Sequence, residues 1–351
     1  MRLASLIAAL LAGLAAACGG GSPSTPDGRP DANVIPIDTP ANVWTWVEIP
    51  GTKCANGTPA GFGVNRSTVG PDLFVFFQGG GACWDGPTCF VTKTSSHIED
   101  TYTAATLAME GYAGTVDHTP AANPLAQATY IYIPYCTGDL HAGAMQRDYD
   151  VNGQLRSVAH VGATNSQIFA DTLRAAFPDA RTVWLAGSSA GGYGATLNMH
   201  RFVDAYPGAA VHLLQDSSPF VPVLANYATW QSSWMLQYPP GCTDCTTSFP
   251  AVVDAVAAAN PSSRIGLLHY DDDVVIRAYF GYAATAGALV PATDELLANQ
   301  YDRPTTKAFV LAGAGHTMLS QIGAITGPNG VKLADWVLQW VTGDAAWATV
   351  R

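Results

Sequence analysis

The sequence is poor in charged residues, and its few cationic residues are scattered. Charged residues make up 12% of the 351 residues, with 16 Lys and Arg against 27 Asp and Glu and a net charge of −11. No cluster of Lys and Arg and no interleaving of Arg with aromatic residues occurs. Proteins that bind nucleic acid present such a basic surface to the phosphates. The composition therefore argues against nucleic acid as a partner, and the acidity weighs against a strongly polyanionic substrate.

Internal repeats and a second domain boundary are also lacking. Hydrophobic residues make up 48% of the chain, and this length and composition are typical of one large α/β domain rather than of a disordered or fibrous chain. We predict a single domain over residues 43–351. A cap-like insertion is expected at about residues 219–250, where prolines gather. We expect the protein to be a monomer.

The amino terminus has the pattern of an export signal. Arg2 supplies the positive charge, residues 3–14 are apolar, and three alanines precede Cys18. The apolar stretch is too short to span a membrane. We predict a signal peptide over residues 1–17 and lipidation of Cys18. Because Leu14 lies one position farther from Cys18 than in the usual lipidation pattern, cleavage without lipidation is the alternative.

The following segment, residues 18–42, is rich in glycine and proline and has no apolar periodicity. These features predict a tether between a membrane anchor and the domain. We therefore expect an exported lipoprotein of the outer membrane or cell surface that contacts the membrane only through Cys18. A secreted or periplasmic protein is the alternative.

The cysteines indicate disulfides rather than metal ligands. Without Cys18, six remain: Cys54, Cys83, Cys89, Cys136, Cys242 and Cys245. An even set in an exported chain predicts three disulfides, and Cys83 with Cys89 brackets a short loop. Cys242 and Cys245 form a C-x-x-C motif, but no second such motif or nearby His pair completes a zinc site. We therefore interpret this motif as structural, and we expect no metal and no cofactor.

Apolar runs alternate with helical patterns along the chain. The runs predict buried parallel strands at residues 73–77, 130–133, 182–185, 210–214, 265–269 and 308–311. The helical patterns lie at residues 165–177, 195–206, 249–259, 274–282 and 332–341. This alternation predicts an α/β fold with a doubly wound, mostly parallel sheet and helices on both faces.

Residues 187–194 read Gly-Ser-Ser-Ala-Gly-Gly-Tyr-Gly and join a predicted strand to a predicted helix. A G-x-S-x-G match alone is weak evidence, but this position is that of a nucleophile on a sharp strand-to-helix turn. The strained backbone there needs small neighbours, and nearly all of these residues are small. We predict that Ser189 is the nucleophile.

The ends of three other predicted strands carry complementary groups. After residues 73–77 comes a glycine run in which Gly80 and Gly81, together with Ala190, can offer N–H groups to a developing oxyanion. The run lacks the Lys-Ser/Thr ending of a phosphate-binding loop. His316 follows residues 308–311 in a small-residue loop and is the candidate base, because it comes last in the chain, as this architecture requires.

The acid that orients His316 is expected among three consecutive aspartates after residues 265–269. Asp271, Asp272 and Asp273 could instead bind calcium, but further oxygen ligands at ordered spacing are not evident. We expect one of the three to act on His316 and the other two to be solvated or to cap the following helix.

Five ordered blocks of sequence resemble the pectin acetylesterase and Notum family of serine carboxylesterases, which have the α/β-hydrolase fold. The blocks are residues 54–62, 78–84, 133–139, 187–192 and 216–217. The resemblance extends from about residue 54 to residue 316. It implies that Ser189 is the nucleophile, that His316 is the base, and that Gly80, Gly81 and Ala190 form the oxyanion hole.

The resemblance also ranks the aspartates. Family members have aromatic residues at a fixed distance after the acid, and Tyr279 and Phe280 stand there relative to Asp273, so Asp273 is the first choice. Ile276 replaces the glutamine of the family. Asp271 is the runner-up because it directly follows Tyr270. A further departure is Ala82, where plant relatives carry Trp.

These observations predict an exported serine carboxylesterase that deacetylates an acetylated polysaccharide. Its partner is an acylated carbohydrate or another ester. A lipase or other acyl-ester hydrolase is one alternative, and a non-catalytic, glycan-binding surface lipoprotein is the other. We expect specificity to lie around Trp230 and Trp234 and in the loop after Gly81.

Overall fold

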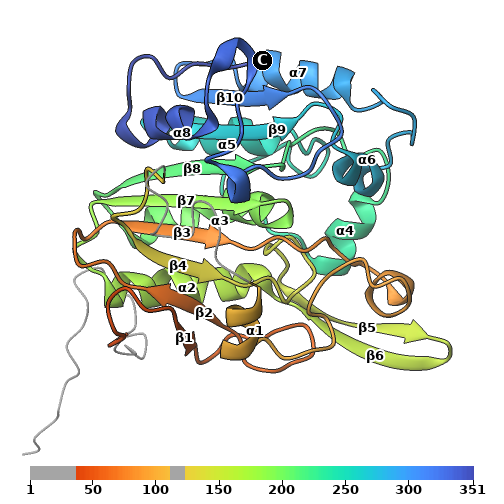
Figure 1. The fold of residues 1–351 in the computed structure, drawn as a ribbon. Coiled ribbons are helices and arrows are strands. Elements are labelled where there is room, and N and C mark those ends of the chain that lie inside the picture. Colours follow the sequence, from red (N-terminus) through yellow and green to blue (C-terminus); the bar gives the residue numbers. More distant parts are fainter. Residues whose placement is uncertain (1–36, 111–122) are drawn as a thin grey trace, which may run out of the picture. The chain divides into compact units, whose positions relative to one another are not determined.

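The computed structural model describes residues 37–110 and 123–351, and a mixed eight-stranded sheet lies at its centre (Figure 1). In spatial order, its strands are β1 (Thr45–Glu48), β2 (Gly61–Asn65), β4 (Thr129–Ile133), β3 (Leu73–Phe77), β7 (Thr182–Ser188), β8 (Ala210–Asp216), β9 (Ile265–Tyr270) and β10 (Thr306–Leu311). The six strands from β4 to β10 are parallel, and β1 and β2 add an antiparallel edge. The prediction of an α/β fold with a mostly parallel sheet is confirmed.

The central strands are apolar along nearly their whole length because both faces of the sheet are covered. All five residues of β4 are buried, as are four of the five in β3. Such continuous apolar runs are typical of parallel strands between two helical layers. All six predicted strands are present, and the edge strands β1 and β2 are additions that the sequence patterns did not indicate.

Helices pack on both faces of the sheet (Figure 1). They are α1 (Ala104–Met109), α2 (Gly162–Ala176), α3 (Ala190–Ala205), α4 (Tyr227–Trp234), α5 (Ala251–Ala259), α6 (Val274–Phe280), α7 (Val290–Gln300) and α8 (Leu333–Thr342). Successive residues of a strand point to opposite faces. In β9, His269 contacts Thr293 of α7, whereas Gly266 lies against Trp336 of α8. The helices α7 and α8 therefore cover opposite faces.

A separate hairpin of β5 (Met145–Val151) and β6 (Gln154–His160) extends beside the sheet (Figure 1). Its two-residue turn consists of Asn152 and Gly153, with φ of 54° and 82°. Positive φ at both positions is the geometry of a type I′ turn, which Asn-Gly favours. The sequence patterns did not predict this hairpin.

Three disulfides connect the six cysteines: Cys54–Cys136, Cys83–Cys89 and Cys242–Cys245. The prediction of three disulfides is confirmed, including the local pair of Cys83 and Cys89. Cys89 of this pair lies within a π-helical turn, Pro87–Val91. His160 lies beside the pair, but both sulfurs are bonded to each other and are not free thiolates.

The predicted signal peptide, the lipidation site at Cys18 and most of the predicted tether lie outside the described residues. The chain contacts the domain from its first described residues, since Ile37 is buried and Ala41 pairs with Arg66. Across residues 37–110 and 123–351, no helix combines the length and the hydropathy needed to cross a membrane.

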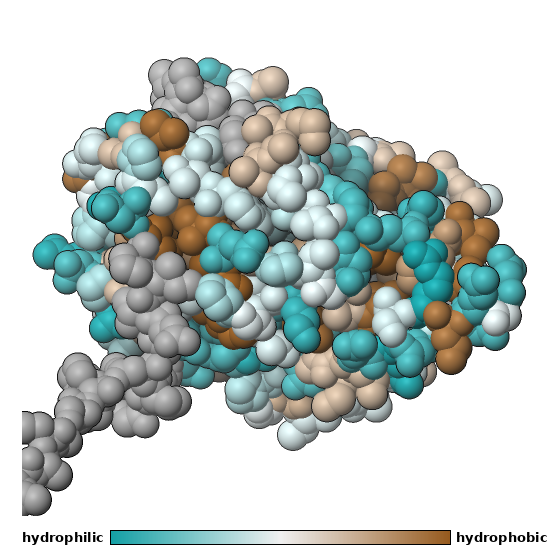
Figure 2. Space-filling model, turned by 90° about the horizontal axis from the view of Figure 1, so that it is seen from below, coloured by the Kyte–Doolittle hydropathy of each residue, from teal (hydrophilic) through white to brown (hydrophobic). Residues whose placement is uncertain are grey.

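The face of the molecule in Figure 2 is chemically mixed. Hydrophobic residues form separate groups among hydrophilic ones. Much of the surface of any folded protein is apolar, so this face by itself assigns no partner.

Candidate active site

The candidate site lies where the order of the parallel strands reverses. From β3 the chain first adds β4 on one side, and later β7 on the other. Ligands of such sheets bind at this point, beyond the carboxyl ends of the strands. In Figure 1 the arrows of these strands point toward α4 and α6. The glycine run after β3 and Ser189 after β7 therefore meet at one place.

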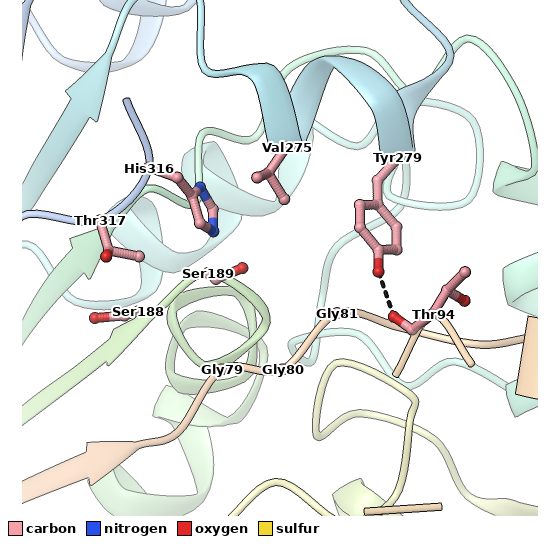
Figure 3. Close-up of a pocket in the computed structure, with 10 residues that line it drawn as sticks. All are labelled: Gly79, Gly80, Gly81, Thr94, Ser188, Ser189, Val275, Tyr279, His316 and Thr317. Atoms are coloured by element: carbon pink, nitrogen blue, oxygen red, sulfur yellow. Dashed lines mark hydrogen bonds between the residues drawn. The ribbon is translucent and has the colours of Figure 1, made fainter. Parts of the chain in front are cut away.

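A pocket of about 380 Å³ opens there (Figure 3). Its lining is Gly79, Gly80, Gly81, Thr94, Ser188, Ser189, Val275, Tyr279, His316 and Thr317. The hydroxyl of Tyr279 donates to the carbonyl of Thr94, which fixes one wall. The structure thus brings together Ser189, His316 and the glycine run. The sequence patterns did not identify Val275, Tyr279 or Thr317 as parts of a pocket.

Ser189 occupies a strained backbone conformation between β7 and α3, with φ 56° and ψ −127°. A positive φ is uncommon outside glycine, and the surrounding structure must stabilise it. The Ser189 N–H donates to the carbonyl of Asp216 at 2.7 Å, and the Ser189 carbonyl accepts from Gly192 N–H at 2.9 Å. In Figure 3 the hydroxyls of Ser188 and Ser189 point in different directions, and only that of Ser189 lies beneath His316.

The glycines around Ser189 allow the backbone segments to approach closely. A Cβ atom on Gly191 would lie 1.9 Å from the carbonyl oxygen of Phe77, and one on Gly187 would lie 2.3 Å from the carbonyl carbon of Gly191. Both distances are far below van der Waals contact. The small residues in the motif therefore have a direct steric cause.

His316 is oriented by Asp273. Its Nδ1 lies 2.7 Å from Oδ2 of Asp273, a side chain with no exposed surface. Because a carboxylate accepts hydrogen bonds, Nδ1 carries the hydrogen, and Nε2 of the neutral ring is left as an acceptor. Figure 3 shows this second ring nitrogen turned toward Ser189. Asp273 also caps α6, since its Oδ1 accepts from the N–H groups of Val275 and Ile276.

The other two aspartates have different partners. Asp272 is buried, forms an ion pair with Arg277 at 2.7 Å and accepts from two backbone N–H groups before α7. Asp271 accepts from Gly313 N–H at 2.9 Å. The expectation that the other two are solvated or cap the helix is wrong for Asp272, which is buried and paired, whereas Asp271 is partly exposed and Asp273 itself is the cap. With the three carboxylates bonded to different protein groups, the cluster does not form one calcium site.

The glycine run presents backbone N–H groups to the pocket. Gly81 has φ 76°, and a Cβ atom on it would lie 2.1 Å from the carbonyl oxygen of Thr94. The carbonyl of Gly80 is turned away, since it accepts from Ser96 N–H at 2.9 Å. Within the described part of the chain, the N–H groups of Gly80, Gly81 and Ala190 donate to no protein acceptor. They are therefore free to bind an oxygen atom in the pocket.

Asp216 connects Ser189 and His316 from behind the pocket. Its carboxylate accepts from Ser188 Oγ at 2.6 Å, from Met318 N–H at 2.8 Å and from Leu319 N–H at 3.1 Å. Burial raises the pKa of Asp216 to about 6. The side chain thus joins the serine turn to the loop that carries His316. The sequence showed Asp216 only as part of a family block and gave it no role.

A second, smaller pocket of about 20 Å³ adjoins the first. Its lining is Gly81, Ala82, Leu140, Ser189, Ala190, Tyr193, Trp230, Val275, Ile276, Tyr279 and Phe280. Ala82, where the family pattern differs, thus borders this side pocket. Trp230 also lines it. Trp234 does not; it stacks on Trp230 and donates to the carbonyl of Cys83.

Two other histidines, His141 and His200, lie close in the sequence to the family blocks. His141 is buried behind the glycine run, where its Nε2 lies 2.9 Å from the carbonyl oxygen of Gln78, and burial lowers its pKa to about 4. His200 lies in the body of α3. Neither lines the pockets around Ser189.

Comparison with known proteins identifies relatives of this chain. Three relatives are palmitoleoyl-protein carboxylesterases called Notum. That of Xenopus laevis is 28% identical over 207 residues, 56% of this chain and 38% of its own. That of Danio rerio is 30% identical over 166 residues, which are 44% of this chain and 30% of its own. The human protein is 29% identical over 182 residues, which are 48% of this chain and 34% of its own. The matches thus span about a third of the length of these relatives.

A family model described as pectinacetylesterase matches residues 41–238. This range includes the glycine run, Ser189 and Asp216, and it ends before Asp273 and His316. It also includes all five blocks that carried the resemblance, so that prediction is confirmed. Since the match covers more than half of the chain, the protein belongs to the pectinacetylesterase family.

Proposed function

We propose that the chain is a serine carboxylesterase of the α/β-hydrolase type that removes acetyl groups from an acetylated polysaccharide. One observation carries the proposal: His316, held by the buried Asp273, faces Ser189 on its strained turn in the 380 Å³ pocket. A nucleophile, a base and a carboxylate that orients the base are the elements of a catalytic triad. A glycan-binding protein without turnover does not need this arrangement.

The first half of the reaction follows from these positions. The ester carbonyl oxygen binds to the N–H groups of Gly80, Gly81 and Ala190. Nε2 of His316 takes the proton from Ser189 Oγ as Oγ attacks the carbonyl carbon. Asp273 stabilises the resulting imidazolium. His316 then gives this proton to the leaving sugar oxygen, the C–O bond breaks, and Ser189 holds the acyl group.

The second half regenerates the enzyme. His316 takes a proton from a water molecule, and the water oxygen attacks the acyl carbon. The same three N–H groups bind the second oxyanion. As that intermediate collapses, His316 returns the proton to Ser189 Oγ, and the carboxylic acid leaves. Apart from the ester and the water molecule, these steps use only groups of the chain.

The two pockets support a small acyl group and a large alcohol. The side pocket of about 20 Å³ has room for a group about the size of a water molecule, which suits the methyl group of acetate. The names of the Notum relatives specify a palmitoleoyl group, a long chain that this side pocket does not accommodate. The 380 Å³ pocket is of the size that holds a small ligand and suits a sugar unit.

We also propose that the protein is exported, with a signal peptide over residues 1–17, a lipidated Cys18, a tether that ends where the chain joins the domain at about residue 37, and the one domain that follows. Three disulfides are typical of an oxidising compartment. Mass spectrometry of the mature protein tests this part. A mature chain that begins at Cys18 and carries a lipid supports it, whereas an unmodified Cys18 or an uncleaved terminus contradicts it.

The catalytic proposal is tested with Ser189→Ala and His316→Gln on p-nitrophenyl acetate. Each variant should lower kcat by at least about a thousandfold, because triad residues act as a unit. His200→Gln is the matched control, since His200 lies on α3 outside the pocket. Release of acetate from acetylated pectin and acetylated xylan identifies the polysaccharide. Substantial activity in the Ser189 variant contradicts the mechanism, and a preference for acyl chains of lipase type contradicts the deacetylase assignment.

A further inference from the structure

The side pocket begins where an ester carbonyl would lie, provided that the proposed esterase function is correct. Gly81 and Ala190, whose N–H groups we assign to the oxyanion, line it together with Ser189. Gly81 and Ser189 also line the larger pocket. The two groups on an ester carbonyl carbon extend in different directions, so one of them enters each pocket. The bulky sugar needs the larger one, which leaves the side pocket for the acyl chain.

The walls of the side pocket suit a hydrocarbon and limit its length. Apart from backbone groups and the hydroxyls of Ser189 and two tyrosines, they are apolar: Ala82, Leu140, Trp230, Val275, Ile276 and Phe280. A volume of about 20 Å³ holds about one water-sized group. The methyl group of an acetyl ester fills that space, and each further methylene has to displace a wall.

Trp230 is the largest side chain among these walls, and packing alone holds it. It is 1% exposed. Its ring stacks on Trp234 at 5.4 Å and 17°, and it meets Phe280 at 5.5 Å and Trp84 at 5.7 Å. Within the described residues, its Nε1 has no hydrogen-bond partner. A smaller side chain at this position therefore enlarges the pocket without breaking a side-chain hydrogen bond.

The other large walls are tied to the structure more firmly. Tyr193 donates to the carbonyl of Pro219 at 2.9 Å, and Tyr279 donates to that of Thr94. Val275 and Ile276 lie in the first turn of the helix that Asp273 caps. Trp230 belongs instead to α4, in the segment between β8 and α5. It takes no part in the hydrogen bonds that hold Ser189, His316 and Asp273. We propose that Trp230 sets the acyl-chain limit of the enzyme and confines it to acetyl-sized groups.

The test is a chain-length series of p-nitrophenyl acetate, butanoate, hexanoate and octanoate. One methylene in an apolar pocket changes kcat/KM by about 10–200-fold. The wild-type protein should therefore lose at least about tenfold from acetate to butanoate. Trp230→Leu should raise the butanoate-to-acetate ratio by at least about tenfold, and Trp230→Phe should raise it less. If Trp230→Leu does not fold, the milder Trp230→Phe decides.

Trp234→Leu is the matched control. Trp234 lies on the same helix, is equally buried and stacks on Trp230, but it does not line the pocket. An equal change of the ratio in this variant would show general loosening and overturn the proposal, as would a wild-type protein that hydrolyses octanoate as fast as acetate. If the wild type hydrolyses p-nitrophenyl acetate but the Trp230 variants keep the wild-type butanoate-to-acetate ratio, only this inference fails. If no ester is hydrolysed, the proposed function fails.

Discussion

Replacing Asp216 by Asn tests whether this residue positions the catalytic groups. The two carboxylate oxygens accept from one hydroxyl and two backbone N–H groups. Asn has only one side-chain acceptor oxygen. In either orientation its NH₂ group faces a buried backbone N–H, of Met318 or of Leu319. One donor then loses its acceptor, at a cost of about 1–3 kcal/mol.

A second effect opposes this cost. The pKa of Asp216 is raised from 3.8 to about 6 by burial, which means that the ionised form is disfavoured by about 3 kcal/mol in the folded protein. Asn removes this penalty at neutral pH. The two terms nearly cancel, so we expect the free energy of unfolding to change by no more than about 2 kcal/mol. The loop of His316, however, loses part of its attachment to the serine turn.

The expected catalytic effect is therefore larger than the effect on stability. Misplacement of a catalytic group by about 1 Å costs about a hundredfold in rate, so Asp216→Asn should lower kcat by about 10- to 100-fold with little change in KM. The assay combines p-nitrophenyl acetate kinetics with urea unfolding. Asp139→Asn is the control, because Asp139 is equally buried, also has its pKa raised to about 6 and accepts from three donors away from His316. Wild-type kcat in the Asp216 variant, or an equal loss in the control, would refute the reasoning.

Two further predictions concern the turn and the pH dependence of stability. Gly191→Ala should abolish activity and lower the melting temperature because its Cβ would overlap the Phe77 carbonyl, whereas Gly70→Ala, with open space around it, should leave both unchanged. Stability should fall as the pH drops from about 6.5 toward 4. Burial lowers the pKa of several histidines to about 4 in the folded protein. In this pH range these imidazoles therefore bind fewer protons in the folded state than in the unfolded state. These are His141, His160, His200, His212 and His269. Each contributes about 1.4 kcal/mol per pH unit, and Asp139 and Asp216, with raised pKa values, offset part of it. Equal urea midpoints at pH 7 and pH 5 would contradict this prediction.

Much of the candidate site was predictable because parallel strands place their carboxyl ends at one edge. Ser189, His316 and Asp273 each follow a strand whose apolar run is plain in the sequence. Knowledge of the strand ends was enough to bring these residues together. The choice among the three aspartates needed more, because only the structure shows that Asp272 binds Arg277 and that Asp273 faces His316.

Features that depend on distant segments were not predictable in the same way. Asp216 acts on residues about a hundred positions later, and no local pattern reports that contact. Trp230 reaches the side pocket from a segment without strand periodicity. The hairpin of β5 and β6 was missed because its strands are mostly polar and half exposed, although its Asn-Gly turn is a strong local signal.

The helix α6 combines two roles, and this limits how the enzyme can diversify. Asp273 caps its first turn and holds His316, while Val275 and Tyr279 of the same helix line both pockets. A substitution that reshapes the pocket through α6 therefore shifts the acid as well, so a new substrate range is gained there at the expense of rate. The helix α4 carries neither the acid nor the base, and it meets α6 at Phe280, the last residue of that helix. Among related enzymes, substitutions that change the substrate range should therefore be found on α4 more often than on α6.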